Sequence, residues 1–115
     1  MSVKIFHNPR CSKSRQTLQL LQEQGVEPEV IEYLKTPPSK AELEDILQKL
    51  NMQPHDLMRK KEAEYKATGM DNKNLDRDAL INGMVNTPKL IERPIVLANN
   101  KAAIGRPPED VLSIL

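Results

Sequence analysis

The sequence predicts an α/β domain in which a βαβ unit and a ββα unit flank an all-helical insertion. Three observations lead to this fold class. Strand-like apolar runs occur near the start of the chain and again after residue 88, a helix pattern connects the first two strand-like runs, and from about 39 to 86 the apolar residues recur at helical spacing. At 115 residues the chain is long enough for one core but too short for two, so we expect a single domain, 1–115.

The βαβ unit comes first. The apolar run 3–6 is typical of a buried strand, and Pro9 ends it because proline lacks the N–H that a strand ladder needs. Segment 15–24 has a helix pattern that Gly25 closes with a left-handed cap. Segment 27–34 alternates as a second strand, which should be parallel to the first because a helix connects them.

The insertion, about 39–86, opens with a capping box formed by Ser39 and Glu42. One apolar helical stripe follows: Leu43, Ile46, Leu47 and Leu50. Pro54 suits the first position of a short helical turn, and a second short helix is expected over 62–68. Asp76 is positioned to cap a last helix. Its apolar residues share one face: Leu80, Ile81, Met84 and Val85.

The ββα unit completes the chain. Apolar runs at 90–91 and 95–98 predict a return to strands. Asn99-Asn100 predicts a tight hairpin into a strand at 102–104. Residues 107–109 suit the start of a final helix with an apolar face. This is the order of elements in a thioredoxin-like fold with an all-helical insertion.

The charge balance restricts the partners. With 17 basic and 16 acidic residues the net charge is +1, so no overall field favours nucleic acid or an anionic membrane. Three aromatic residues and no tryptophan argue against a base-stacking surface. Basic residues nevertheless recur locally, which suits a small anion: Arg10, Lys13, Arg15, Arg59, Lys60, Lys61, Arg93 and Arg106.

Cys11 is the single cysteine, so no internal disulfide can form. The sequence shows neither a signal peptide nor an apolar span of about twenty residues. We therefore expect a cytoplasmic protein. A lone cysteine is more often a small buried residue than a nucleophile. However, Cys11 is predicted on a strand-to-helix turn, where the N–H groups and the dipole of a helix N-terminus stabilise a thiolate.

The neighbours of Cys11 favour the nucleophile. Ser12 and Ser14 have hydroxyls close enough to donate hydrogen bonds to a thiolate. Because position 14 is serine, there is no Cys-x-x-Cys pair, and a second thiol must come from outside the chain. His7 either supports the thiolate as an imidazolium or closes the strand with a backbone hydrogen bond. Two separated histidines, His7 and His55, and one cysteine do not give zinc-ligand spacing, so no metal is expected.

Arg93 and Arg106 lie at the edges of the predicted last strands, where their side chains can converge on the turn of Cys11. A guanidinium offers planar, bidentate donors to a tetrahedral oxyanion. Arginine is also a common surface residue, and this applies to Arg59 as well. From the residues alone we predict a thiolate beside an oxyanion site.

Five motifs, in order and across nearly the whole chain, resemble the glutaredoxin-linked arsenate reductases of thioredoxin-like fold. They are His7-Asn8-Pro9-x-Cys11-x-x-Ser14-Arg15, Tyr33-Leu34-x-x-Pro37-Pro38-Ser39, Leu57-Met58-Arg59-Lys60, Pro88-x-Leu90-Ile91-x-Arg93-Pro94-Ile95-Val96 and Arg106-Pro107-x-Glu109-x-Val111-Leu112-x-Ile114-Leu115. The resemblance implies that the Cys11 thiolate attacks arsenate and forms a covalent thiol-arsenate adduct. Glutathione would then add as co-substrate, and glutaredoxin would resolve the mixed species as arsenite leaves. No tightly bound cofactor is implied.

The same resemblance implies roles for the other site residues. Arg59, Arg93 and Arg106 would bind the oxyanion. The residue at His7 would help the cysteine to ionise, and the one at Ser14 would hydrogen-bond its sulfur. Asn8 and Pro94 would be structural at the site, with Pro94 cis and facing the cysteine loop.

Sibling branches of this fold leave two alternatives. One is a glutathione-dependent thiol/disulfide reductase without arsenate activity, against which the complete arginine set argues. The other is a binding or regulatory protein that associates with RNA polymerase, against which the missing Cys-x-x-Cys pair and the near-neutral charge argue as well. We expect arsenate reduction, with the thiol reductase as the alternative.

Overall fold

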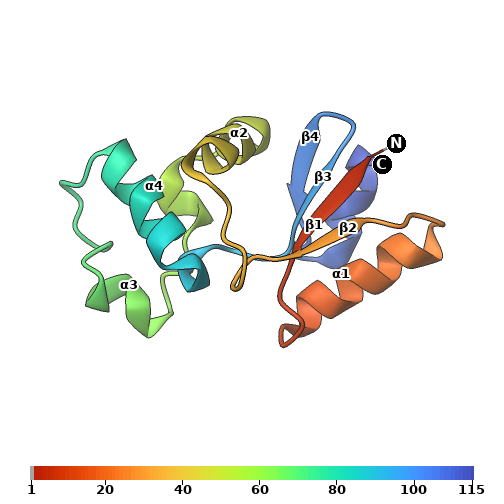
Figure 1. Cartoon of the computed structure of the whole chain (residues 1–115), viewed down its shortest axis with the longest axis horizontal. Coiled ribbons are helices and arrows are strands. Elements are labelled where there is room, and N and C mark those ends of the chain that lie inside the picture. Colours follow the sequence, from red (N-terminus) through yellow and green to blue (C-terminus); the bar gives the residue numbers. More distant parts are fainter. Residues whose placement is uncertain (1) are drawn as a thin grey trace. The chain divides into compact units, whose positions relative to one another are not determined.

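The protein, described over residues 2–115 by a computed structural model, consists of two compact units (Figure 1). The first contains the chain up to Thr36 together with Arg93–Leu115, and the second contains Pro37–Glu92. The first unit carries the whole sheet and the second is built of helices and turns. The expected sequence of strands, helical insertion and strands is thus present.

The sheet of the first unit has the strand order β2-β1-β3-β4. The strands are β1 (Val3–His7), β2 (Glu29–Glu32), β3 (Ile95–Ala98) and β4 (Lys101–Ile104). The central strand β1 is parallel to β2 and antiparallel to β3. Helix α1 (Ser12–Glu23) connects β1 to β2, which confirms the predicted parallel pair.

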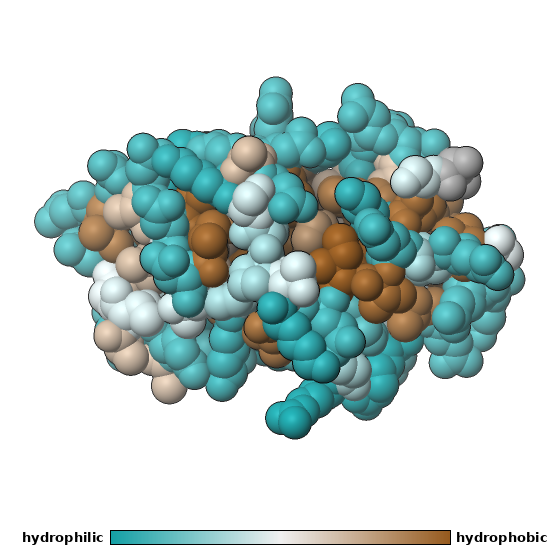
Figure 2. All heavy atoms as spheres, viewed as in Figure 1, coloured by the Kyte–Doolittle hydropathy of each residue, from teal (hydrophilic) through white to brown (hydrophobic). Residues whose placement is uncertain are grey.

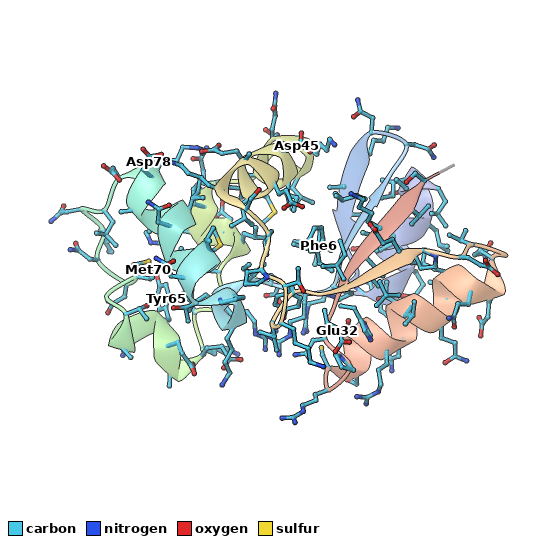
Figure 3. The ribbon with its side chains drawn as sticks, in the orientation of Figure 1. Phe6, Glu32, Asp45, Tyr65, Met70 and Asp78 are labelled. Carbon is cyan, nitrogen blue, oxygen red and sulfur yellow. The ribbon has the colours of Figure 1, made fainter. Side chains whose placement is uncertain are left out.

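One face of the sheet carries the core of the first unit. Leu21 of α1 and Val111 of the 3-10 helix η3 (Pro108–Ile114) are fully buried there. They belong to one cluster with residues of β1 and β3: Val3, Ile5, Val96 and Ala98. Because side chains alternate along a strand, Phe6 projects from the opposite face of β1 (Figure 3). Helix α1 is therefore held against the same strand whose end leads into the turn of Cys11.

The hairpin between β3 and β4 has the predicted form. Asn99 and Asn100 have φ values of 52° and 62°, and a two-residue turn with both residues in the left-handed region matches the twist of paired strands. Gly25, with φ 77°, follows the end of α1 as its left-handed cap. Both expectations are confirmed.

The second unit contains helices of modest length. They are α2 (Lys40–Leu50), η1 (Pro54–Leu57), α3 (Ala63–Ala67), α4 (Arg77–Asn86) and η2 (Pro88–Leu90). The capping box at α2 is present: the Glu42 N–H donates to Ser39 Oγ over 3.1 Å and the Ser39 N–H donates to Glu42 Oε1 over 3.0 Å. Asp76 caps α4 by accepting from the Ala79 N–H. The buried faces of α2 and α4 are formed by Leu43, Ile46, Leu47, Leu80, Ile81 and Met84.

Around α3, the second unit is held by aromatic and backbone contacts. The rings of His55 and Tyr65 meet edge to face, with their centroids 6.3 Å apart. Met70 lies beside Tyr65 (Figure 3), and its N–H donates to the Tyr65 carbonyl. His55, expected to be structural, hydrogen-bonds through Nε2 with the Met70 carbonyl at 2.8 Å.

Two predicted elements were wrong. The strand expected at 90–91 is absent: Pro88 starts the 3-10 turn η2, whose bonds use the N–H groups of Leu90 and Ile91, so only an isolated bridge from Ile91 to Met58 remains. The final helix is 3-10 rather than α. Its buried residues Pro108, Val111 and Ile114 are spaced by three, which is the period of a 3-10 helix.

On the face shown in Figure 2, hydrophilic side chains cover most of the surface, with apolar areas between them. The large apolar residues with substantial exposure include Val30, Leu34 and Leu112. Over residues 2–115, none of the helices has both the length and the apolar character that a membrane crossing requires.

Candidate active site

Cys11 lies in the turn between β1 and α1 and is the N-cap residue of the helix. Asn8 shapes this turn twice: its carbonyl accepts from the Cys11 N–H and its side-chain Oδ1 accepts from the Arg10 N–H, each over 3.0 Å. The Cys11 carbonyl then accepts from the Arg15 N–H, which starts the helix. The thiol is half-buried and is held between the end of a central strand and the first turn of a helix.

Ser14 is fully buried in the first turn of α1 and joins that turn to the end of β1. Its Oγ accepts from the Asn8 N–H over 3.0 Å and lies 2.6 Å from Nδ1 of His7. The hydroxyl is thus engaged by residues 7 and 8. The group that Ser14 turns toward the Cys11 sulfur is its backbone N–H.

His7 is buried at the end of β1. Burial lowers the pKa of its imidazole below the usual range, Glu32 raises the pKa in part, and Arg15 lowers it further. The neutral imidazole therefore predominates near pH 7. This favours a hydrogen-bonding role for His7 at Ser14 over an imidazolium beside the sulfur.

Arg106 connects the two chain segments of the first unit, because its side chain contacts both Cys11 and Arg93. Its Nη2 donates to Cys11 Sγ over 3.5 Å, and its Nε donates to the Arg93 carbonyl over 2.8 Å. The peptide bonds Arg93-Pro94 and Arg106-Pro107 are both cis. The cis form of Pro94 that the resemblance implied is confirmed, whereas that of Pro107 was not predicted.

The charges around Cys11 favour its ionised form. Burial by itself would raise the pKa of the thiol. The Ser14 N–H and the Arg93 guanidinium outweigh this effect by hydrogen bonding to the sulfur, and the positive charges of Arg93 and Arg106 add to it, so that the pKa lies below its ordinary value. The site therefore places a thiol of lowered pKa next to two guanidinium groups.

Gly105 allows the chain to approach this site closely. Its N–H donates to the Pro94 carbonyl over 2.9 Å. A Cβ at this position would lie 2.8 Å from Pro94 Cγ and would overlap Thr17 Oγ1 of α1. A side chain at residue 105 would therefore overlap both of these neighbours.

Arg59 lies in the second unit, where it is paired with two carboxylates. Its Nε donates to Glu62 Oε1 over 3.2 Å and its Nη1 donates to Glu92 Oε1 over 3.0 Å. Neither glutamate was considered as a site residue from the sequence. Glu62 is brought to Arg59 by a turn in which its N–H donates to the Arg59 carbonyl, whereas the contact with Glu92 depends on the fold of the second unit.

A family model described as the ArsC family matches residues 6–114. The chain belongs to the ArsC family.

Two curated proteins are similar to this chain over almost their whole length. A protein of Neisseria meningitidis serogroup A / serotype 4A (strain DSM 15465 / Z2491) named Arsenate reductase is 54% identical over 114 residues, covering 98% of this chain and 97% of that protein. A protein of Escherichia coli (strain K12) named Uncharacterized protein YfgD is 59% identical over 114 residues, covering 98% and 96%.

Solved structures agree with the fold of the ArsC family chain. A structure described as Arsenate reductase from Vibrio cholerae is 52% identical, with a TM-score of 0.97, and covers 100% of this chain and 98% of that one. Another, described as a putative arsenate reductase from Yersinia pestis, is 53% identical with a TM-score of 0.95, covering 98% and 100%. The predicted thioredoxin-like fold is confirmed.

Within this ArsC family chain, the first unit brings together most of the residues singled out in the sequence: His7, Asn8, Cys11, Ser14, Arg93, Pro94 and Arg106. Arg59 belongs to the second unit with its two glutamates. Chemically, the first unit alone offers a nucleophilic sulfur, donors that stabilise its charge, and cationic groups suited to an anionic substrate.

Proposed function

We propose that the chain is an arsenate reductase. One observation carries this proposal: the Cys11 sulfur, at the N-terminus of α1, accepts a hydrogen bond from Arg106 and has its charge stabilised by Arg93. A thiolate and an arsenate anion repel each other, so an attack of one on the other requires cationic groups at the point where they meet. The names of the relatives, which include several arsenate reductases, support the same activity.

In the proposed reaction, the Cys11 thiolate attacks the arsenic atom of arsenate, and an arsenic oxygen leaves as water with a proton from solvent. This gives the thiol-arsenate adduct. The thiolate of glutathione then bonds to the same arsenic atom and displaces a second oxygen as water. A glutaredoxin thiolate attacks the glutathione sulfur, the electron pair of that sulfur–arsenic bond passes to arsenic, and a glutaredoxin–glutathione disulfide leaves; water then cleaves the bond between arsenic and Cys11, which releases arsenite and the free thiol. The single cysteine of the sequence suits this scheme, because the other thiols come from outside the chain.

The three arginines would bind the oxyanion. Arg106 and Arg93 would neutralise the charge of the arsenate next to the sulfur and stabilise the oxygen atoms as charge shifts during attack. Arg59 is proposed as the third oxyanion ligand. His7, Ser14 and Asn8 would hold the cysteine loop, and Pro94 would fix the chain that carries Arg93.

The experiment is to measure arsenite formation with arsenate, glutathione and glutaredoxin. We expect turnover by the parent protein, its loss in Cys11→Ser, and a strong reduction in Arg106→Ala. Arg77→Ala is the matched control, because Arg77 pairs with Glu44 in the second unit and has no proposed role. No turnover by the parent, or undiminished turnover in Cys11→Ser, would contradict the proposal.

A glutathione-dependent thiol/disulfide reductase is the second candidate, because a stabilised thiolate is sufficient for thiol exchange. Disulfide exchange needs no oxyanion ligand. A disulfide reductase assay without arsenate, in which Arg59→Ala equals the parent, together with no arsenite formation, would favour this activity. Association with RNA polymerase would be tested by co-purification.

A cytoplasmic location is part of the proposal. The scheme consumes reduced thiols, and a reducing compartment maintains them. Fractionation of cells that express the native protein would test it.

A further inference from the structure

The second unit holds Arg59 in a cluster of acidic side chains. We propose that Glu62 and Glu92 are positioning residues that fix the orientation of the Arg59 guanidinium for oxyanion binding. This inference rests on the proposed function, because it assumes that Arg59 binds the arsenate. It extends the site by two residues that do not themselves touch the substrate.

The two carboxylates engage different nitrogens of the guanidinium. Glu62 Oε1 accepts from Nε over 3.2 Å and Glu92 Oε1 accepts from Nη1 over 3.0 Å. The side chains of Arg59, Glu62 and Glu92 are 22%, 21% and 26% exposed, so these bonds are shielded from water more than ordinary surface pairs are. Two bonds at separate nitrogens fix the guanidinium plane, and among residues 2–115 neither bond uses the Nη2 amino group, which can donate to an anion.

The backbone of the second unit places Arg59 and Glu92 beside each other. The Arg59 N–H donates to the Leu90 carbonyl over 2.7 Å and the Glu92 N–H donates to the Leu57 carbonyl over 2.8 Å. Between them, Met58 and Ile91 form an antiparallel bridge. These bonds hold segments 57–59 and 90–92 side by side. The pairing of Arg59 with Glu92 therefore follows from the backbone structure of the second unit.

Lys89 holds Glu62 from its other side. Its Nζ lies 3.8 Å from Glu62 Oε2 and 3.1 Å from Glu64 Oε1. Glu62 therefore binds Arg59 with one oxygen and faces a lysine with the other. This reduces the freedom of the carboxylate, as its role as a support for Arg59 requires.

Charge alone would give these carboxylates the opposite effect on anion binding. Negative charges next to an oxyanion ligand weaken anion binding, so removing one should tighten it by about twofold to threefold if charge were all that mattered. A flexible arginine, however, loses rotamer freedom when it binds an anion, and a pre-oriented arginine does not. The two explanations therefore predict changes of opposite sign.

The test compares Glu92→Gln with Glu92→Ala. Glutamine keeps an oxygen that accepts from Arg59 but removes the charge, whereas alanine removes both. We expect Glu92→Ala to raise the KM for arsenate by about fivefold to tenfold with a smaller change in kcat, since a misplaced ligand weakens substrate binding. Glu92→Gln should keep the parent KM or lower it slightly. Glu62→Ala should act in the same direction as Glu92→Ala.

Two controls separate positioning from general damage. Glu64→Ala removes a carboxylate that pairs with Lys89 but not with Arg59, and should leave the KM unchanged. In an Arg59→Ala background, Glu92→Ala should have no further effect, because the residue acts only through the arginine. Thermal melting of each variant identifies those that fail to fold. If an alanine variant fails to fold, Glu92→Gln and Glu62→Gln are compared with the parent instead.

The outcomes are distinct. If the parent reduces arsenate and Glu92→Ala has the parent KM, or a lower KM as a pure charge effect predicts, the positioning role is wrong and the proposed function stands. If the parent protein does not reduce arsenate, and the Cys11→Ser variant does not bind arsenate in calorimetry, the proposed function is wrong and the positioning role is wrong with it.

Discussion

Arg106 donates from Nη2 to the sulfur of Cys11 over 3.5 Å while its Nε donates to the Arg93 carbonyl over 2.8 Å. The guanidinium is thus anchored to the backbone of Arg93, the other arginine that lowers the pKa of the Cys11 thiol. Because the anchor uses Nε, the end of the side chain remains directed at the sulfur. The thiol and its cationic partner are therefore set by one side chain with two fixed contacts.

Loss of this contact should weaken the ionisation of Cys11. Arg106→Ala removes a positive charge that lowers the pKa of the thiol, so that pKa should rise. The measurement is the pH dependence of alkylation by iodoacetamide, with a peptide of residues 7–15 as the reference. The parent midpoint should lie below that of the peptide, and the variant midpoint should lie between the two.

Arg106→Lys is the control for this prediction, because it keeps the charge but loses the two-point geometry. A parent midpoint at or above that of the peptide would contradict an activated thiol.

The lowered pKa of Cys11 also makes the stability of the folded protein depend on pH. A thiol whose pKa is lower in the folded state adds stability above the pKa of the unfolded chain, and this is lost as the pH falls through the folded pKa.

The imidazole of His7 should titrate at lower pH than a histidine in an unfolded peptide. Burial lowers its pKa, Glu32 raises it and Arg15 lowers it, so Glu32→Gln should lower the midpoint further and Arg15→Gln should raise it. NMR titration of the ring protons measures each midpoint. The folded protein should lose stability as the pH falls below about 6.5, because the unfolded chain then binds the proton more readily. A midpoint above the peptide value would instead support an imidazolium at the site.

Gly105→Ala should destabilise the first unit. The new methyl group would lie 2.8 Å from Pro94 Cγ and overlap Thr17 Oγ1, and overpacking of this kind costs about 1–3 kcal/mol. Denaturant unfolding followed by circular dichroism measures the loss. Because residue 106 follows directly, the alkylation midpoint of Cys11 should also rise.

Gly83→Ala in α4 is the matched control for that substitution. There the three atoms nearest to the methyl group all belong to the flexible side chain of Met70, and alanine is favoured over glycine in a helix by about 1 kcal/mol. We expect no loss of stability or a small gain. Equal losses in the two variants would show that the tight approach at Gly105 has no special effect.

Ser39→Ala should destabilise the start of α2. The serine hydroxyl accepts from the Glu42 N–H over 3.1 Å, and loss of such a cap costs about 1 kcal/mol. Denaturant unfolding is again the measurement. Ser39→Asp keeps a capping oxygen and should recover most of the loss; if it fails to do so, the cap is not the cause.

The sequence alone was sufficient for elements whose signals are local. The Ser39–Glu42 box, the Asn99-Asn100 turn and the position of α4 after Asp76 depend on neighbouring residues and were predicted correctly. The segment around Leu90 was not, because apolar residues suit a buried turn as well as a strand. Its assignment depended on how the Pro88 turn used the backbone N–H groups.

The sequence predicted which residues belong to the site better than it predicted which of them contact each other. Cys11 at a helix start could be found from the pattern, and Arg93 and Arg106 from chemistry and resemblance. The sequence did not reveal that the Ser14 hydroxyl is engaged by His7 and Asn8, or that Gly105 packs against Pro94 and Thr17. These contacts join residues whose distances are set by tertiary packing, which a single sequence does not encode locally.

The turn that carries Cys11 follows directly from β1, a strand bonded to neighbours on both sides. A central strand of this kind exchanges its amide hydrogens with solvent only when the unit unfolds as a whole. The amides of Ile5 and Phe6 should thus be among the slowest to exchange deuterium, and those at the edge strand β2 faster. Local fraying would then rarely displace Cys11, and the thiol would keep its position for as long as the first unit stays folded.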